Sequence, residues 1–155
     1  MGASSSFDVQ MNVDIYLSYP EKTEYIERIM DTLQNMNFTV INSSLMIQSK
    51  KDLSPSEISK YMEIFIEKTK FIFVCISKDT IKSVTQIMEM NEIMDKYPTL
   101  QTKIVYFMMD QDYTPITNTE LKSIVKKNLW FPIYDEDSLF YTTNKLLTLL
   151  MNNVE

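Results

Sequence analysis

Glu89 is the side chain in this sequence that is best placed to do chemistry. It lies on the first or second turn of a helix expected to begin near Ser83, after a buried strand at Phe71–Ile76 and a polar turn at Ser77–Asp79. In an open α/β sheet, ligands bind in the crevice beyond the carboxyl ends of the strands. The sequence therefore predicts a carboxyl group at the mouth of a pocket, where it can take part in acid–base chemistry or stabilise positive charge.

Several common kinds of site cannot form because the residues that they need are absent from the sequence. The chain contains no histidine, which excludes Ser–His and Cys–His nucleophilic pairs and histidine metal sites, so no metal is expected. Cys75 is the only cysteine, so no internal disulfide can form, and its place within a predicted strand indicates a small buried apolar residue. The only glycine is Gly2, which excludes glycine-rich phosphate and dinucleotide loops, and we expect no bound cofactor.

The charge of the chain also limits its partners. A net charge of −6 argues against nucleic-acid binding, which needs a basic face. No apolar run reaches the roughly 18 residues that a membrane-spanning helix requires. We therefore expect a cytoplasmic protein whose single domain covers residues 11–151.

Strands and helices are expected to alternate along the chain. Short β-branched and aromatic runs predict strands, and apolar residues at helical spacing predict the helices between them. The expected strands are Val13–Ser18, Phe38–Ile41, Phe71–Ile76, Lys103–Met109 and Leu129–Ile133. Two helices are expected to begin at Thr23 and Ser54. Three more are expected at Ser83–Lys96, Glu120–Lys127 and Asp135–Met151. Five strand–helix units predict an α/β fold, a flavodoxin-like doubly wound five-stranded parallel sheet with helices on both faces.

Local signals mark several of the boundaries. Thr23 is an expected N-cap, and Ser54 with Glu57 three residues later is an expected capping box. Asn37 follows the first helix at a place where a glycine is usual. Pro132 places the last strand at an edge of the sheet or at its own end.

Residues 1–10 are small and polar and are expected to form a disordered tail. They begin Met-Gly-Ala-Ser-Ser-Ser, which fits the N-myristoylation pattern with Gly2 as the acceptor and Ser6 as the hydroxyl residue. The alternative is a chance match or a remnant of cloning. Because one myristoyl chain gives only reversible binding, an acylated Gly2 predicts weak membrane attachment of a cytoplasmic protein.

Three patches together resemble the Toll/interleukin receptor (TIR) domain family. Asp14–Tyr19 (DIYLSY) is close to the family's opening strand motif, Asp-Val-Phe-Ile-Ser-Tyr. The family has a serine after its third strand, a second serine six residues later and a glutamate six residues after that. Ser77, Ser83 and Glu89 match this pattern. The pair Trp130–Phe131 is similar to the family's late aromatic box in reversed order. We expect this pair in the core, and ligand stacking is the alternative. The resemblance covers residues 11–151 and implies the same flavodoxin-like fold.

The resemblance implies a specific role for Glu89. In family members that cleave NAD, the matching glutamate is catalytic and works at the nicotinamide ribose, so NAD would be a substrate. Cleavage of that glycosidic bond passes through an oxocarbenium-like state, whose positive charge a carboxylate stabilises. Ser18, Tyr19 and Ser83 are the accompanying candidates for nucleotide contact. The alternatives are a solvated carboxylate near a helix N-terminus for Glu89 and a hydrogen-bonding strand end for Ser18.

The loop after the second strand often mediates TIR–TIR contact and closes over the ligand in enzymatic members of the family. It corresponds here to Lys50, Lys51, Asp52, Leu53, Ser54 and Pro55. This chain has no glycine in that loop, and Thr85 and Gln86 stand where the family often has Trp-Cys. A mobile charged loop is the alternative interpretation of this segment.

Two functions follow from the resemblance. The first is a signalling module, of the kind used in innate immunity, that acts through self-association with TIR-type domains or through adaptor interactions. The second is an NAD hydrolase that uses Glu89 and is activated by assembly. A phosphoacceptor receiver domain shares the five-strand alternation, but it needs an aspartate at the end of the third strand, where this chain has Ser77.

Overall fold

The computed structural model describes residues 13–42, 54–100, 103–110 and 130–152. Strands and helices alternate as expected from residue 13 to residue 110. The strands are β1 (Ile15–Ser18), β2 (Val40–Ile41), β3 (Phe71–Ile76), β4 (Ile104–Met108) and β5 (Trp130–Pro132). The helices are α2 (Glu24–Asn35), α4 (Pro55–Lys68), the short 3-10 helix η1 (Thr80–Lys82), α5 (Val84–Asp95), α6 (Tyr97–Leu100) and α8 (Glu136–Asn152).

The five strands form one parallel sheet in the order β2-β1-β3-β4-β5. The chain first moves outward from β1 to β2 and then crosses back to place β3 on the other side of β1, which makes the sheet doubly wound. This confirms the predicted flavodoxin-like α/β fold. The change of direction falls between β1 and β3, and ligand crevices of open α/β sheets form at such switch points.

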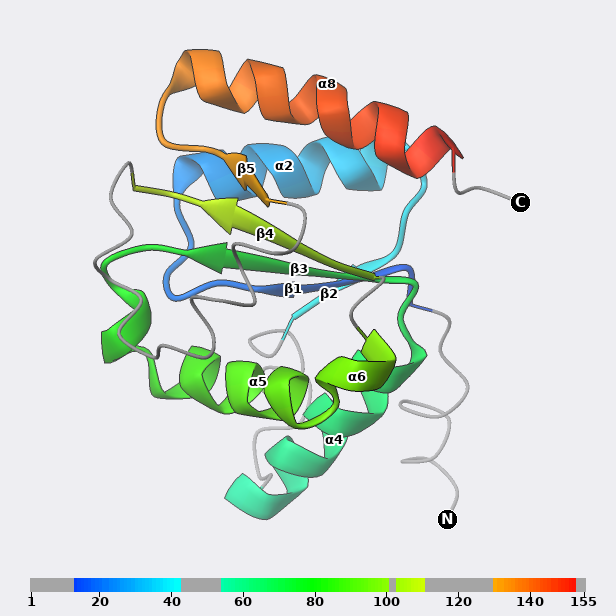
Figure 1. The fold of residues 1–155 in the computed structure, drawn as a ribbon, viewed down its shortest axis with the longest axis vertical. Helices are drawn as coiled ribbons and strands as arrows, with labels where there is room; N and C mark the ends of the chain where they lie inside the picture. Colours follow the sequence, from blue (N-terminus) through cyan, green and yellow to red (C-terminus); the bar gives the residue numbers. More distant parts are fainter. Residues whose placement is uncertain (1–12, 43–53, 101–102, 111–129, 153–155) are drawn as a thin grey trace.

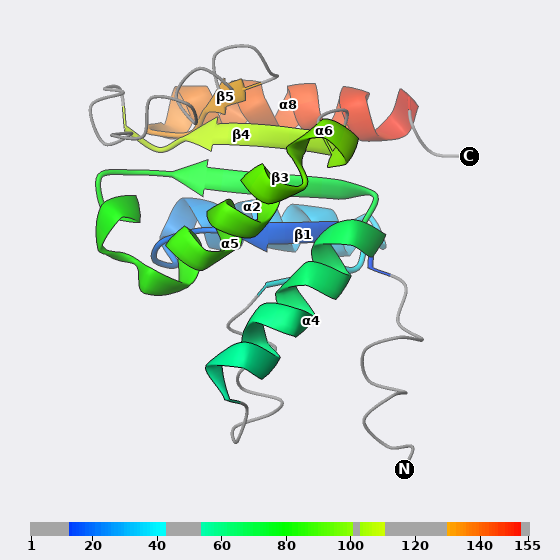
Figure 2. The same cartoon turned by 60° about the horizontal axis from the view of Figure 1, so that its bottom comes forward.

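Helices cover both faces of the sheet. Helices α2 and α8 lie side by side on one face, and α4, α5 and α6 lie on the other (Figures 1 and 2). The strand residues alternate accordingly: in β1, Ile15 and Leu17 belong to the core under α2 and α8, while Tyr16 belongs to the core under α4 and α5. Burial on both faces explains why the strands appear in the sequence as continuous apolar runs.

Hydrogen bonds at the starts of α2 and α4 confirm the predicted N-cap and the predicted capping box. Thr23 Oγ1 accepts from Ile26 N (3.3 Å) at the start of α2. At the start of α4, Glu57 N donates to Ser54 Oγ (3.3 Å) and Ser54 N donates to Glu57 Oε1 (3.0 Å), which completes the capping box. These bonds satisfy N–H groups that a helix N-terminus otherwise leaves without a partner.

Some details differ from the expectations. Trp130 was expected in the core but is 39% exposed, because it begins β5, the edge strand that Pro132 indicated. Its neighbour Phe131 is buried as expected. The four-residue helix α6 was not expected, although Pro98 is compatible with it because proline is tolerated in a first helical turn. The helix expected at Glu120–Lys127 lies outside the described residues.

Candidate functional site

The carboxyl group of Glu89 lies beneath α5, against the carboxyl end of β1. The Tyr16 hydroxyl donates to Glu89 Oε2 (2.5 Å) and the Ser18 hydroxyl donates to Glu89 Oε1 (2.9 Å). Glu89 is only 1% exposed, and Tyr16 and Ser18 are fully buried. The structure thus unites residues more than seventy positions apart in the sequence, with separations of 73 and 71 residues.

Strand periodicity explains why these three side chains meet. Tyr16 and Ser18 are two residues apart in β1, so both point to the face that α5 covers. Ser83 sets the start of α5, since its Oγ accepts from Gln86 N (3.1 Å), and the buried side of the helix then carries Gln86, Glu89, Met90 and Ile93. A buried carboxyl group is tolerated only with hydrogen-bond partners, so the cluster also joins α5 to β1.

The other residues predicted from the sequence do not join this cluster. Tyr19 packs with the core on the α2–α8 face, on the opposite side of the sheet from Glu89. Ser83 is the N-cap of α5, which is a structural role. Ser54 and Pro55 begin α4, whereas Lys50–Leu53 and Gly2 lie outside the described residues, so the interaction loop and the acylation remain predictions.

Tyr16 is the residue that sequence reasoning missed. An aromatic residue in the middle of a buried strand predicts only core packing. The available signal was its position two residues before Ser18, which places both hydroxyl groups on one face of β1.

Gln86 fixes α5 to the end of β3. Its Nε2 donates to the backbone oxygen of Cys75 (2.7 Å), and the side chain is fully buried. Its Oε1 is a buried atom with no hydrogen-bond partner in the described part of the chain. Burial raises the pKa of the Cys75 thiol far above its usual value, so this cysteine stays protonated and unreactive.

A cavity of about 280 Å³ opens at the carboxyl edge of the sheet, on the α2–α8 side. It is lined by Glu21, Thr23, Tyr25, Ser77, Lys78, Asp79, Met109, Asp110, Ile133 and Tyr134. Glu89 is not among these residues, so it does not stand at the mouth of this cavity. Three carboxyl groups against one lysine give the lining a negative charge, which is unfavourable for the pyrophosphate of a dinucleotide.

The surroundings of Tyr25 in α2 also carry negative charge. Partial burial and the nearby carboxylates of Glu136, Asp135 and Glu24 raise the pKa of Tyr25 above its ordinary value. Arg28 partly offsets this field, with its guanidinium 6.0 Å from the centre of the Tyr25 ring.

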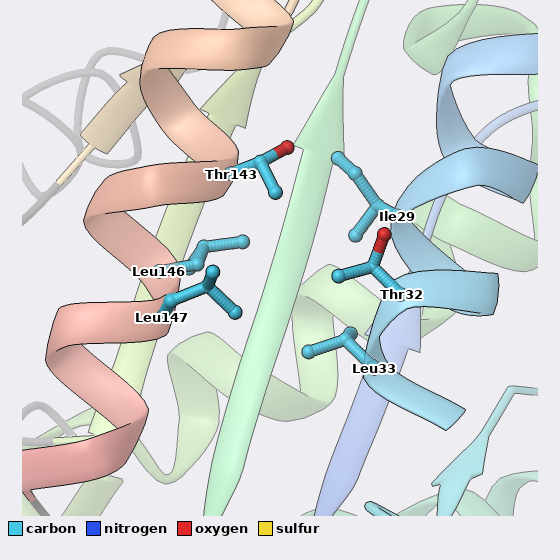
Figure 3. Close-up of a pocket in the computed structure, with 6 residues that line it drawn as sticks. All are labelled: Ile29, Thr32, Leu33, Thr143, Leu146 and Leu147. Atoms are coloured by element: carbon cyan, nitrogen blue, oxygen red, sulfur yellow. The ribbon is translucent and has the colours of Figure 1, made fainter. Parts of the chain in front are cut away.

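A groove runs between α2 and α8. Figure 3 shows one part of it, where Ile29, Thr32 and Leu33 of α2 face Thr143, Leu146 and Leu147 of α8 around a void of about 10 Å³. Nearer the start of α8, a larger cavity of about 230 Å³ is lined by Arg28, Thr32, Glu136, Leu139, Phe140 and Thr143. Phe140, on the rim of that cavity, is 72% exposed.

The described residues contain neither a metal-binding cluster nor a membrane-spanning helix. In residues 13–42, 54–100, 103–110 and 130–152, no group of three or more His, Cys, Asp or Glu side chains is arranged to hold a metal ion. In the same part of the chain, no helix combines the length and apolar character needed to cross a bilayer.

The order of the strands and the helices on both faces define a doubly wound α/β domain. The carboxyl group of Glu89 lies beside the switch point of its sheet. The family model described as "TIR domain" matches residues 15–139. The chain therefore belongs to the TIR domain family, which confirms the resemblance seen in the sequence.

A solved structure has the same fold. The TIR domains of the activated Roq1 resistosome, which directly recognises the pathogen effector XopQ, share 17% sequence identity with this chain at a TM-score of 0.53. The match covers 74% of this chain and 69% of the other. Among curated protein sequences, none matches this chain.

Proposed function

We propose that this domain is a signalling module that works by associating with TIR domains, and that a second copy of the chain docks on the face formed by α2 and α8. Membership of the TIR family supports the class of function. The structural neighbour is the TIR part of an assembled resistosome, which supports assembly as the mode of action.

The observation that carries the docking surface is the exposure of Phe140 beside a groove. A phenylalanine that is 72% exposed on the rim of a cavity offers an aromatic anchor next to a place that can receive one. Tyr141, next to it on α8, is also exposed. Large exposed apolar side chains gathered at one place mark interaction sites.

The charges on this face suit a second copy of the same chain. Arg28 forms an ion pair with Glu136 (2.8 Å) and approaches Glu24 (3.7 Å), so both signs of charge surround the groove. A two-fold interface places a patch against its own copy, which requires a self-complementary surface. Arg28 of one copy can then pair with carboxylates of the other while Phe140 enters the opposite groove.

Sedimentation over a range of protein concentrations tests this docking. We expect wild type to self-associate and Phe140→Ser to weaken association by about tenfold or more, the effect of losing a buried aromatic anchor. Met151→Ser is the matched control, because Met151 is 65% exposed on the last turns of the same helix. Equal association of both variants, or a wild type that stays monomeric at every concentration, contradicts the second-copy interface. A monomer that binds another TIR domain would instead support an adaptor role.

We also propose a second function, hydrolysis of NAD with Glu89 as the catalytic residue. The cluster of Glu89 with Ser18 is the observation that favours it, because it brings two predicted site residues together at the carboxyl end of β1. In the reaction, the bond between the ribose carbon and the nicotinamide nitrogen breaks, and nicotinamide leaves with the electron pair. The carboxylate stabilises the oxocarbenium-like sugar until water adds to it and loses a proton.

Release of nicotinamide by the purified protein is the direct measurement for this second function. Wild type is expected to consume NAD, more rapidly at concentrations where it self-associates, and Glu89→Gln is expected to lose the activity. Equal consumption by both proteins removes Glu89 from the mechanism.

A further inference from the structure

Tyr16 holds one oxygen of Glu89 from a fixed position inside the sheet. Its backbone lies in β1 between Ile41 of β2 and Ile72 of β3, and its side chain is fully buried in the core under α4 and α5. A ring packed at the density of a protein interior cannot follow a neighbour that moves. The Tyr16 hydroxyl therefore favours one location of the Glu89 carboxyl group.

Ser18 holds the other oxygen from a different kind of position. It is the last residue of β1, at the carboxyl edge of the sheet, and its short hydroxyl can rotate to suit a new partner. Movement of Glu89 toward a ligand at that edge takes it away from Tyr16 but keeps it near Ser18. Such a movement therefore breaks the hydrogen bond to Tyr16 (2.5 Å). A phenylalanine in place of Tyr16 would fill the same space in the core and leave Glu89 Oε2 without this donor.

We propose that Tyr16 is a positioning residue that keeps Glu89 in its buried location, so that the carboxyl group becomes available only when the Tyr16–Glu89 hydrogen bond opens. This inference rests on the proposed NAD hydrolysis for its functional meaning, and it makes Tyr16 a brake on that reaction. Loss of one such buried hydrogen bond changes the ratio of held to released Glu89 by about tenfold.

Carboxyl labelling of the folded chain tests the position of Glu89 directly. Wild type and Tyr16→Phe are treated with a water-soluble carbodiimide and an amine, and modification is located by fragmentation of the tryptic peptide covering residues 83–96. That peptide also contains Asp95, an exposed residue that serves as an internal reference. We expect Glu89 labelling relative to Asp95 to rise about tenfold in Tyr16→Phe.

Two further variants separate the proposed role from general loosening of the core. Tyr106→Phe removes the hydroxyl of an equally buried tyrosine in β4, which interacts with Tyr97, and it should label like wild type. Ser18→Ala leaves the Tyr16 bond in place, so Glu89 should also remain protected. NAD consumption, measured in parallel, should rise in Tyr16→Phe and not in Tyr106→Phe, an increase that a purely structural role would not produce.

The outcomes distinguish this inference from the function on which it rests. Unchanged Glu89 labelling in Tyr16→Phe, or an equal rise in Tyr106→Phe, overturns the role of Tyr16 whether or not NAD is cleaved. Increased labelling confined to Tyr16→Phe supports that role. If Tyr16→Phe shows this increased labelling but consumes no NAD, as expected for Glu89→Gln, the positioning by Tyr16 stands and the proposed hydrolysis fails.

Discussion

At the scale of single residues, Glu89 links the stability of the domain to its proposed chemistry. Its two oxygens accept hydrogen bonds from Tyr16 and Ser18, and all three side chains are buried. A substitution at this position therefore changes the core as well as the candidate site. Glutamine is the better substitution for an activity test because it keeps the size of the side chain and one acceptor oxygen.

Glu89→Ala should destabilise the domain more than Glu89→Gln. The alanine variant removes the acceptor from two buried hydroxyl groups, and each loss costs about 1–3 kcal/mol. The glutamine variant can still accept from one of them. Urea unfolding of the two variants and wild type measures the difference. If both variants unfold at the same urea concentration, these hydrogen bonds contribute little to stability.

At the scale of elements, the junction between α2 and β2 shows how a chain with one glycine ends a helix. Asn37 has a positive φ of 69°, its N–H donates to Gln34 O (2.9 Å), and Phe38 N donates to Leu33 O (3.1 Å). These are the two hydrogen bonds of a Schellman motif, in which the left-handed residue is usually glycine. Asparagine is the best substitute because it tolerates that conformation.

The stability of variants at Asn37 should depend on how readily the new residue adopts a positive φ, and not on the size of its side chain. Asn37→Ala is expected to lower stability by about 1 kcal/mol, because alanine lacks the short polar side chain that lets asparagine tolerate positive φ through local hydrogen bonds. Asn37→Gly, although a larger change in side chain, should stay close to wild type because glycine adopts this φ without strain. Thermal or urea unfolding compares them. A glycine variant less stable than the alanine variant would show that positive φ at this position does not limit stability.

At the scale of the whole molecule, carboxylates at helix starts on both faces of the sheet couple the fold to pH. Ser138 N donates to Asp135 Oδ1 (2.7 Å) at the start of α8, and this bond holds the pKa of Asp135 below its ordinary value. The hydrogen bond from Ser54 N does the same for the pKa of Glu57 at the start of α4. A carboxyl group with a lowered pKa stabilises the folded state when it is ionised.

The sign of this effect predicts a loss of stability in acid. The two ionised carboxylates contribute to the stability of the folded state above their unfolded-state pKa values, about 3.9 for Asp and 4.3 for Glu. This contribution is lost as the pH falls through the lower pKa values of the folded state. The double variant Asp135→Asn with Glu57→Gln should therefore lose stability less steeply than wild type below about pH 4. Urea unfolding as a function of pH measures both slopes. Parallel acid slopes in the two proteins contradict this assignment.

Much of the fold could be predicted because its signals are local. The alternation of apolar strands with amphipathic helices predicted the sheet and its two covered faces, and the caps at Thr23 and Ser54 followed from residue type alone. Trp130 shows the limit of this reasoning. An aromatic residue in a strand predicts burial, but its 39% exposure depends on β5 being an edge strand, which is a property of the assembled sheet.

By itself, the sequence determined the class of the domain, the absence of histidine chemistry and the choice of Glu89 as the candidate carboxyl group. Spacing along the chain is enough for those conclusions because residue type and helical or strand periodicity are local properties. Only the tertiary structure decided that Glu89 is buried and that Tyr16 holds it. The two residues are 73 positions apart, and their contact depends on how α5 packs across β1, which no local pattern encodes.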